Sequence, residues 1–176
     1  GPPDLIIPLD DFYVPGGAAD AWVGVTPVLT VLTEDRYVSS VYMRVFNDVQ
    51  SSDAGGTIVG GLYIVHHMTW QTTVIGAGDE RDTWPVHELG RNPDIFDPKA
   101  GRLLAAGSSV MPLTYHLHSN GRDTNGHMEL GFYFHPKGYE PKHKKAQWSL
   151  GDGLNISIQG NMPGQELHTY TVLKEH

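Results

Sequence analysis

Hydrophobic and polar residues alternate over short stretches along most of the chain. The longest such stretch is residues 36–46, where β-branched and aromatic residues recur with a period of two, the spacing of a half-buried β-strand. Similar stretches predict further strands at residues 4–7, 28–32, 57–68, 102–106, 109–118, 128–134, 155–159 and 166–173. No segment of ten or more residues carries the 3.6-residue apolar stripe of a helix. The pattern therefore predicts an all-β protein.

Turn residues separate these stretches and indicate how the strands are arranged. The chain contains 21 glycines and 12 prolines among its 176 residues, which suits many short strands joined by tight turns. Residues 76–99 have little periodicity and predict a long irregular connection, which in a compact domain is often functional. We predict an antiparallel, jelly-roll-like β-sandwich in which residues 1–176 form one domain.

Charge and composition narrow the possible partners and chemistry. The formal net charge is -8, from 20 acidic and 12 basic residues, which argues against a nucleic-acid partner. The sequence has no run of about 18 apolar residues, so membrane insertion is not expected. The chain has no cysteine, so a disulfide or a thiolate metal site is impossible and a transition metal would need histidine, carboxylate or methionine ligands.

The chain has ten histidines, and two groups of them fall at the ends of predicted strands. His66 and His67 follow one apolar strand, and His116 and His118 end another. Residues two apart in a strand share a face, so His116 and His118 can point at one ion. Adjacent residues face opposite ways, so His66 and His67 can share an ion only where their strand twists, bulges or ends. Because imidazole binds copper and zinc well, we predict that at least one of these two histidine groups binds a metal ion.

Two alternatives remain open at this point. His118 is a possible further ligand, and so is Met128, because methionine is a soft ligand that favours Cu(I). A set of His116, His118 and Met128 is therefore a competing site. A histidine on an apolar strand can also be an ordinary hydrogen-bonded residue of the core, in which case no metal binds. No role is assigned to His87, His135, His143, His168 or His176.

Several segments resemble the copper type II, ascorbate-dependent monooxygenases, a family that includes peptidylglycine alpha-hydroxylating monooxygenase and dopamine beta-monooxygenase. The tripeptide His66-His67-Met68 resembles the family's His-His-Met. Residues 101–108 contain a Leu-x-x-Gly-Ser turn and lead into the segment Tyr-His-Leu-His-Ser-Asn-Gly at residues 115–121, followed by a Gly-aromatic strand at residues 130–134. This order is similar to that in bacterial members of the superfamily. Residues 1–7 and 32–36 also resemble those sequences.

The resemblance implies a particular site and partner. In that family two consecutive β-sandwich domains each hold one copper, and the first domain's copper passes electrons through an adjacent histidine pair and a third histidine from a later strand. His66 and His67 match the pair, and His116 matches the third ligand. The chain then corresponds to the N-terminal, electron-transfer half of a two-domain unit. The animal enzymes are braced by disulfides, which this chain lacks.

The resemblance also implies a function. The chain is expected to be the copper domain of an ascorbate-dependent, monooxygenase-like oxidoreductase outside the cytoplasm, periplasmic or secreted. A second copper domain or a redox partner protein would complete it, with ascorbate as a small reductant, and the isolated domain would not be active alone. Zinc is the alternative metal. The alternative functions are a non-catalytic module that binds or delivers copper, and a structural β-sandwich subunit.

Overall fold

The computed structural model describes residues 1–24, 26–48, 64–74, 81–88, 91–143 and 160–166, which contain strands and turns and no helix. The contacts divide the chain into a first unit, Gly1–Lys144, and a second unit, Lys145–His176. In the second unit the described residues, 160–166, form a turn. The strand predicted at 155–159 lies outside the described residues, and so do residues 167–173 of the strand predicted at 166–173. No described helix is long and apolar enough to cross a membrane.

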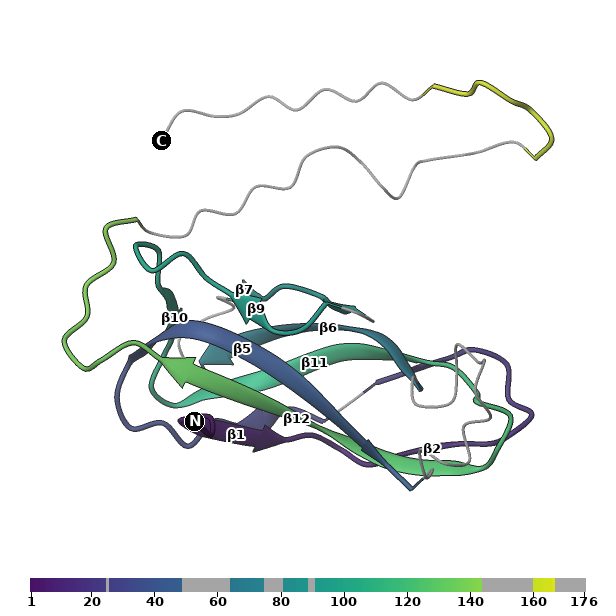
Figure 1. Cartoon of the computed structure of the whole chain (residues 1–176), viewed down its shortest axis with the longest axis horizontal. Coiled ribbons are helices and arrows are strands. Elements are labelled where there is room, and N and C mark those ends of the chain that lie inside the picture. Colours follow the sequence, from purple (N-terminus) through teal and green to yellow (C-terminus); the bar gives the residue numbers. More distant parts are fainter. Residues whose placement is uncertain (25, 49–63, 75–80, 89–90, 144–159, 167–176) are drawn as a thin grey trace. The chain divides into compact units, whose positions relative to one another are not determined.

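Two antiparallel sheets make up the first unit (Figure 1). The first sheet has the order β1-β12-β5-β10, with β2 also paired to β12 and β9 also paired to β5. Its bounds are β1 (Leu5–Pro8), β2 (Phe12–Val14), β5 (Arg36–Asn47), β9 (Asp94–Ile95), β10 (Arg102–Leu104) and β12 (Thr124–Phe134).

The second sheet carries the two histidine groups. It has the order β3-β11-β6-β7, with β4 also paired to β11 and β8 also paired to β6. Its bounds are β3 (Ala21–Val23), β4 (Val28–Leu29), β6 (Val65–Val74), β7 (Arg81–Thr83), β8 (His87–Glu88) and β11 (Ser108–Leu117). The long pairing of β11 with β6 forms its centre, and the short strands cover its edges.

One hydrophobic core joins the inner faces of the two sheets, because alternate side chains of both sheets belong to the same buried cluster. Its aromatic centre is Trp70, Trp84 and Phe132. The indoles of Trp70 and Trp84 stack with their centroids 5.0 Å apart, and Phe132 packs edge-on against both. The Trp70 indole N–H donates a 2.9 Å hydrogen bond to the carbonyl of Pro85. The predicted antiparallel β-sandwich is thereby confirmed.

The strand that carries the histidine doublet differs from its prediction. The sequence predicted a strand over residues 57–68 with the doublet at its end; residues 57–63 lie outside the described residues, and β6 (Val65–Val74) continues past Met68, so the doublet is not at the end of its strand. Met68 and Trp70 are buried on the core side of the sheet, and this inward alternation continues the strand past Met68.

Other differences concern short strands. Strands β7, β8 and β9 lie within residues 76–99, which the sequence predicted to be irregular, and β2 and β3 were not predicted. Each of these strands has only two or three residues, too few to show an alternating pattern. These short strands form because each is hydrogen-bonded to the edge of a longer strand, as β3 is to β11.

Candidate metal centre

A β-bulge turns both members of the histidine doublet to the same side of the second sheet. Across β6 and β11, His67 pairs with His116 and Val65 pairs with Leu117, so His66 is an extra residue without an opposite partner. Val65 and Met68 are both buried, whereas His66 is exposed and His67 is half-buried. From Val65 to Met68 the side chains therefore point inward, outward, outward and inward. A bulge of this kind re-aims a side chain and lets two adjacent residues share one site.

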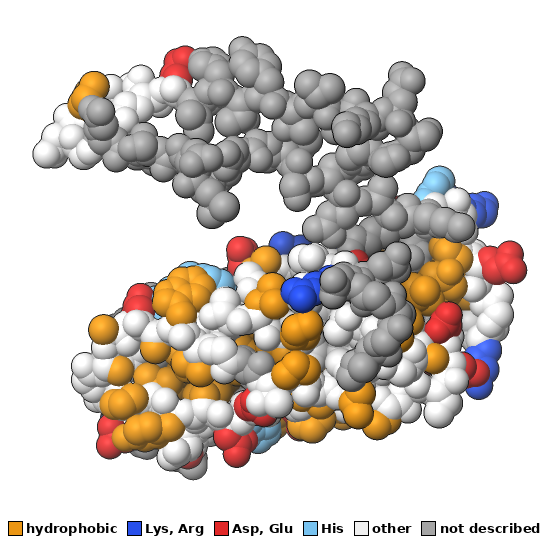
Figure 2. Space-filling model, turned by 180° about the vertical axis from the view of Figure 1, so that it is seen from behind, with side chains coloured by type: hydrophobic (Ala, Val, Ile, Leu, Met, Phe, Trp, Pro, Cys, Tyr) orange, Lys and Arg blue, Asp and Glu red, His pale blue; other side chains and the backbone are white. Residues whose placement is uncertain are grey.

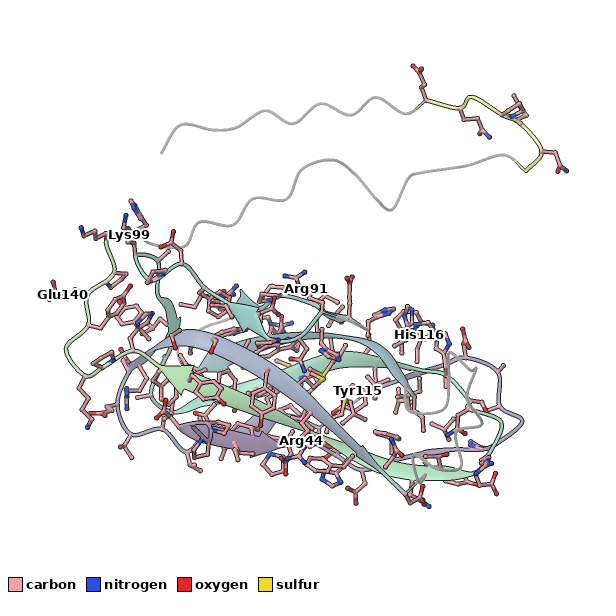
Figure 3. The ribbon with its side chains drawn as sticks, in the orientation of Figure 1. Arg44, Arg91, Lys99, Tyr115, His116 and Glu140 are labelled. Carbon is pink, nitrogen blue, oxygen red and sulfur yellow. The ribbon has the colours of Figure 1, made fainter. Side chains whose placement is uncertain are left out.

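The alternation along β11 and the residue that follows it places His116 and His118 on that same outer face. Tyr115 and Leu117 point into the core and are each 1% exposed, so His116 and His118 point away from it. The predicted shared face of His116 and His118 is thus present. Figure 3 labels His116 near the end of β11, beside the beginning of β6.

Three imidazoles converge through their Nδ1 atoms. The Nδ1 of His67 lies 2.9 Å from that of His66 and 3.3 Å from that of His116. The structure therefore brings together all three predicted ligands, His66, His67 and His116, although they come from two strands far apart in the sequence. Each of these contacts can be an N–H···N hydrogen bond whose direction depends on the tautomers, and the same three Nδ1 atoms, when all unprotonated, could share one cation.

The spacing of these nitrogens fits a single transition-metal ion. An imidazole nitrogen lies about 2.0–2.1 Å from zinc, and two such ligands at 90–110° are roughly 2.9–3.4 Å apart. Both of the measured Nδ1 separations, 2.9 Å and 3.3 Å, fall in that interval. The donor set is neutral and entirely nitrogen, the type that suits copper or zinc.

Asp20, which precedes β3, fixes the orientation of the His116 ring. Its Oδ2 lies 3.3 Å from the Nε2 of His116 and 3.6 Å from the Nε2 of His118. When the His116 Nε2–H donates to this carboxylate, the lone pair of Nδ1 faces His67. A carboxylate behind a ligating histidine holds the tautomer and raises the basicity of the ring.

Trp22 of β3 covers the same imidazoles from the side. It pairs with His116 across the strands, and their rings stack with centroids 4.2 Å apart and an angle of 2° between planes. It also meets the His67 ring edge-on at 4.8 Å. Trp22 is 59% exposed, and Figure 2 shows histidine side chains reaching the surface beside exposed hydrophobic ones. Strand β3 thus supports the histidines and shields one side of them.

The surroundings of the His67 side chain lower its pKa. Partial burial lowers the pKa of the His67 imidazole below its ordinary value of 6.5, and the charges that His116 and His66 carry when protonated lower it further. Glu88, which pairs with His67 across β6 and β8, acts in the opposite direction. The neutral ring is the form that binds a cation. Because the pKa of His67 is lowered, protons compete with a metal ion for this ring at a lower pH than for an ordinary histidine.

The competing ligand set is not brought together. Met128 lies on β12 of the first sheet and is fully buried in the core, whereas His116 and His118 point outward from the second sheet. Met68 is likewise buried between the sheets. Of the histidines given no role, His87 forms part of β8 and His135 stacks on Tyr139. His143 lies in the described part of the loop after β12, whereas His168 and His176 lie outside the described residues.

An open cavity of about 550 Å³ lies elsewhere in the described structure. It is lined by residues of the first sheet and its loops, and His127, which stacks on Phe46, is its one histidine. The cavity shares no residue with the histidine cluster. Asp11 and Asp48 also line the cavity, but the group of potential metal ligands found close together among the described residues is that of the second sheet, so the cluster there is the better candidate site.

Two supporting residues were not predicted from the sequence. Asp20 and Trp22 lie about a hundred positions before His116; Trp22 belongs to a strand of three residues, and Asp20 directly precedes that strand. The alternation of Asp20, Trp22 and their neighbours is too short to indicate a strand by itself. Only the pairing of β3 with β11 brings them to the histidines.

The contact between Trp22 and His116 gives a spectroscopic prediction. Cu(II) bound at the histidines is expected to quench the fluorescence of Trp22, because the indole stacks directly on one imidazole. The Trp22→Phe variant keeps an aromatic ring there and should lose most of the copper-dependent quenching seen in the unaltered chain. Zn²⁺, which has no redox chemistry, serves as the control titrant. Equal fractional quenching in the two proteins would place the copper away from Trp22.

No family model, curated protein or solved structure matches this chain.

Proposed function

We propose that this chain is a copper-binding β-sandwich domain that holds an electron-transfer copper through His66, His67 and His116. In this proposal it serves an ascorbate-dependent, monooxygenase-like oxidoreductase. The observation that carries the proposal is the convergence of three Nδ1 atoms at separations of 2.9 Å and 3.3 Å on one face of the second sheet. The resemblance of the His66-His67-Met68 segment to the copper monooxygenases supports the same assignment.

Copper is the proposed metal because of the donor set and the binding order of divalent ions. For a given site of nitrogen ligands, Cu²⁺ generally binds more tightly than Zn²⁺. Copper also supplies one-electron chemistry between Cu(I) and Cu(II) when bound, which zinc does not. Imidazole is an acceptable ligand to both oxidation states, so a set of histidines can hold the ion through a redox cycle.

The residues around the site perform the task that electron transfer requires. His67 and His116 come from two paired strands at the centre of the sheet, so their separation is fixed by backbone hydrogen bonds. Asp20 orients the His116 ring, and Trp22 packs against it. Ligands held in this way change position little when the charge of the ion changes.

An electron donor can also reach the site. His66 is exposed on the outer face of the sheet, so a small reductant or a redox partner protein can approach the ligands without opening the core. We propose ascorbate as the small reductant and a second copper domain, or a separate redox protein, as the acceptor. The proposed location is outside the cytoplasm, as in the enzymes that the sequence resembles.

Copper titration of the metal-free chain tests this function. We expect one Cu(II) per chain, an electron paramagnetic resonance spectrum with nitrogen ligands, and loss of that spectrum when ascorbate is added, followed by recovery on reoxidation. Binding of copper without reduction by ascorbate would favour a non-catalytic module that binds or delivers copper. A chain that takes up neither copper nor zinc would contradict the proposal and favour a structural β-sandwich subunit.

A further inference from the structure

His118 lies within the same cluster as the three proposed ligands. The potential ligand atoms of His66, His116 and His118 all lie within 4.8 Å of one another. The His118 ring stacks on that of His66, with centroids 4.8 Å apart, and lies 4.5 Å from the centroid of His116. Its backbone N–H donates a 2.8 Å hydrogen bond to the carbonyl of Ile64, which fixes it beside the beginning of β6.

The Nε2 atom of His118 lacks a hydrogen-bond partner among the described residues. It is buried and makes no hydrogen bond to any described residue. The nearest carboxylate oxygen, Oδ2 of Asp20, is 3.6 Å away, beyond a normal hydrogen bond. A buried polar atom without a partner destabilises a fold, so in native proteins such an atom often serves a function or binds a ligand or ion.

The geometry points to His118 as a fourth imidazole ligand, which closes the coordination shell of the ion that we propose for this site. This inference rests on the proposed function and deepens it. Four protein ligands are typical of metal sites without an open position, whereas catalytic sites keep a position for water or substrate. Cu(I), the oxidation state that reacts with oxygen, takes at most four ligands, so four histidines would leave it no vacant position for oxygen, which favours the electron-transfer role over the oxygen-binding one.

The closed shell also separates this site from the three-histidine set implied by the sequence resemblance. His118 is placed by the period of β11, since it lies two residues after His116 and shares its face. The bulge at His66 turns the His66 ring to the same face, where it stacks on the ring of His118. No rearrangement of either strand is needed to gather the four rings on one face of the sheet.

Azide binding to the copper-loaded chain tests the inference. Azide is a small anion that produces a strong charge-transfer absorption band when it occupies an equatorial position on Cu(II), the position that a fourth imidazole would fill. We expect no such band for the unaltered chain and a clear band for His118→Ala. The nitrogen couplings in the electron paramagnetic resonance spectrum should fall from four imidazoles to three. The affinity for Cu(II) should fall by at least about tenfold in the variant.

Two controls keep the outcomes apart. His127→Ala removes a half-buried histidine from the first sheet and should leave both the affinity and the azide response unchanged. If the His118→Ala variant folds poorly, His118→Asn repeats the test with a polar side chain. The azide measurement on the unaltered chain does not depend on any variant. Azide binding to the unaltered copper chain, or three imidazoles in its spectrum, would overturn the inference while leaving the proposed function intact. Failure of the unaltered chain to bind copper would overturn the proposed function itself.

Discussion

Replacing His66 and His67 together by alanine is expected to lower the affinity of the chain for Cu(II) by more than about a hundredfold. Loss of a residue that merely orients a metal ligand already lowers affinity by about 10–100-fold, and these two residues are proposed to bind the ion directly. Their Nδ1 atoms lie 2.9 Å apart, and removing both takes away two of the three ligands that we propose for the ion. Competition for copper against a chelator of known affinity measures the change.

The matched control removes two histidines that lie outside the cluster. His135 stacks on Tyr139, and His143 lies in a loop, so His135→Ala combined with His143→Ala should leave the copper affinity unchanged. Because His66 is exposed, the doublet variant should change the free energy of unfolding of the metal-free chain only slightly, by less than about 1 kcal/mol. An unchanged copper affinity in the doublet variant would remove His66 and His67 from the site.

The largest effect on stability is expected for Trp70→Ala, which should lower the free energy of unfolding by about 3–5 kcal/mol. Trp70 is 2% exposed and stacks on Trp84, so alanine would leave a large cavity between the sheets. The substitution also removes the hydrogen bond from the indole to the carbonyl of Pro85. Urea denaturation of the metal-free chain, followed by circular dichroism, measures the change.

Trp22→Ala is the matched control for that measurement, since it removes the same side chain from the surface. Trp22 is 59% exposed and contacts histidines on the outer face, so its loss should change the free energy of unfolding by less than about 1 kcal/mol. Equal destabilisation by the two substitutions would contradict the placement of Trp70 in the core and of Trp22 outside it.

The long strands were predictable because their pattern is local. Strands β5, β11 and β12 each have ten or more residues. The period-two alternation of apolar and polar residues by which they are recognised can be seen within each segment of the sequence by itself. The short strands were not, because a strand of two or three residues such as β3 is defined by the neighbour to which it is hydrogen-bonded. The antiparallel sandwich follows from the long strands alone, which is why the predicted architecture is confirmed although several edge strands were missed.

The site was predictable only in part, for a related reason. The shared face of His116 and His118 follows from the spacing of two residues in a strand. The bulge that turns His66 to the side of His67 depends on how β6 is registered against β11, and that register is not visible in either segment. Whether Met128 faces the core or the histidines likewise depends on which sheet β12 joins, and the soft-ligand argument could not decide it.

X-ray absorption at the copper edge of the loaded chain tests the central claim most directly, because it reports the atoms bound to the ion. The account predicts a shell of nitrogen scatterers at about 2.0 Å with the outer-shell scattering of several imidazoles, and no sulfur. A copper–sulfur distance near 2.3 Å, or a shell without imidazole, would contradict it, because the methionines at positions 68 and 128 are both buried away from the outward-facing histidines.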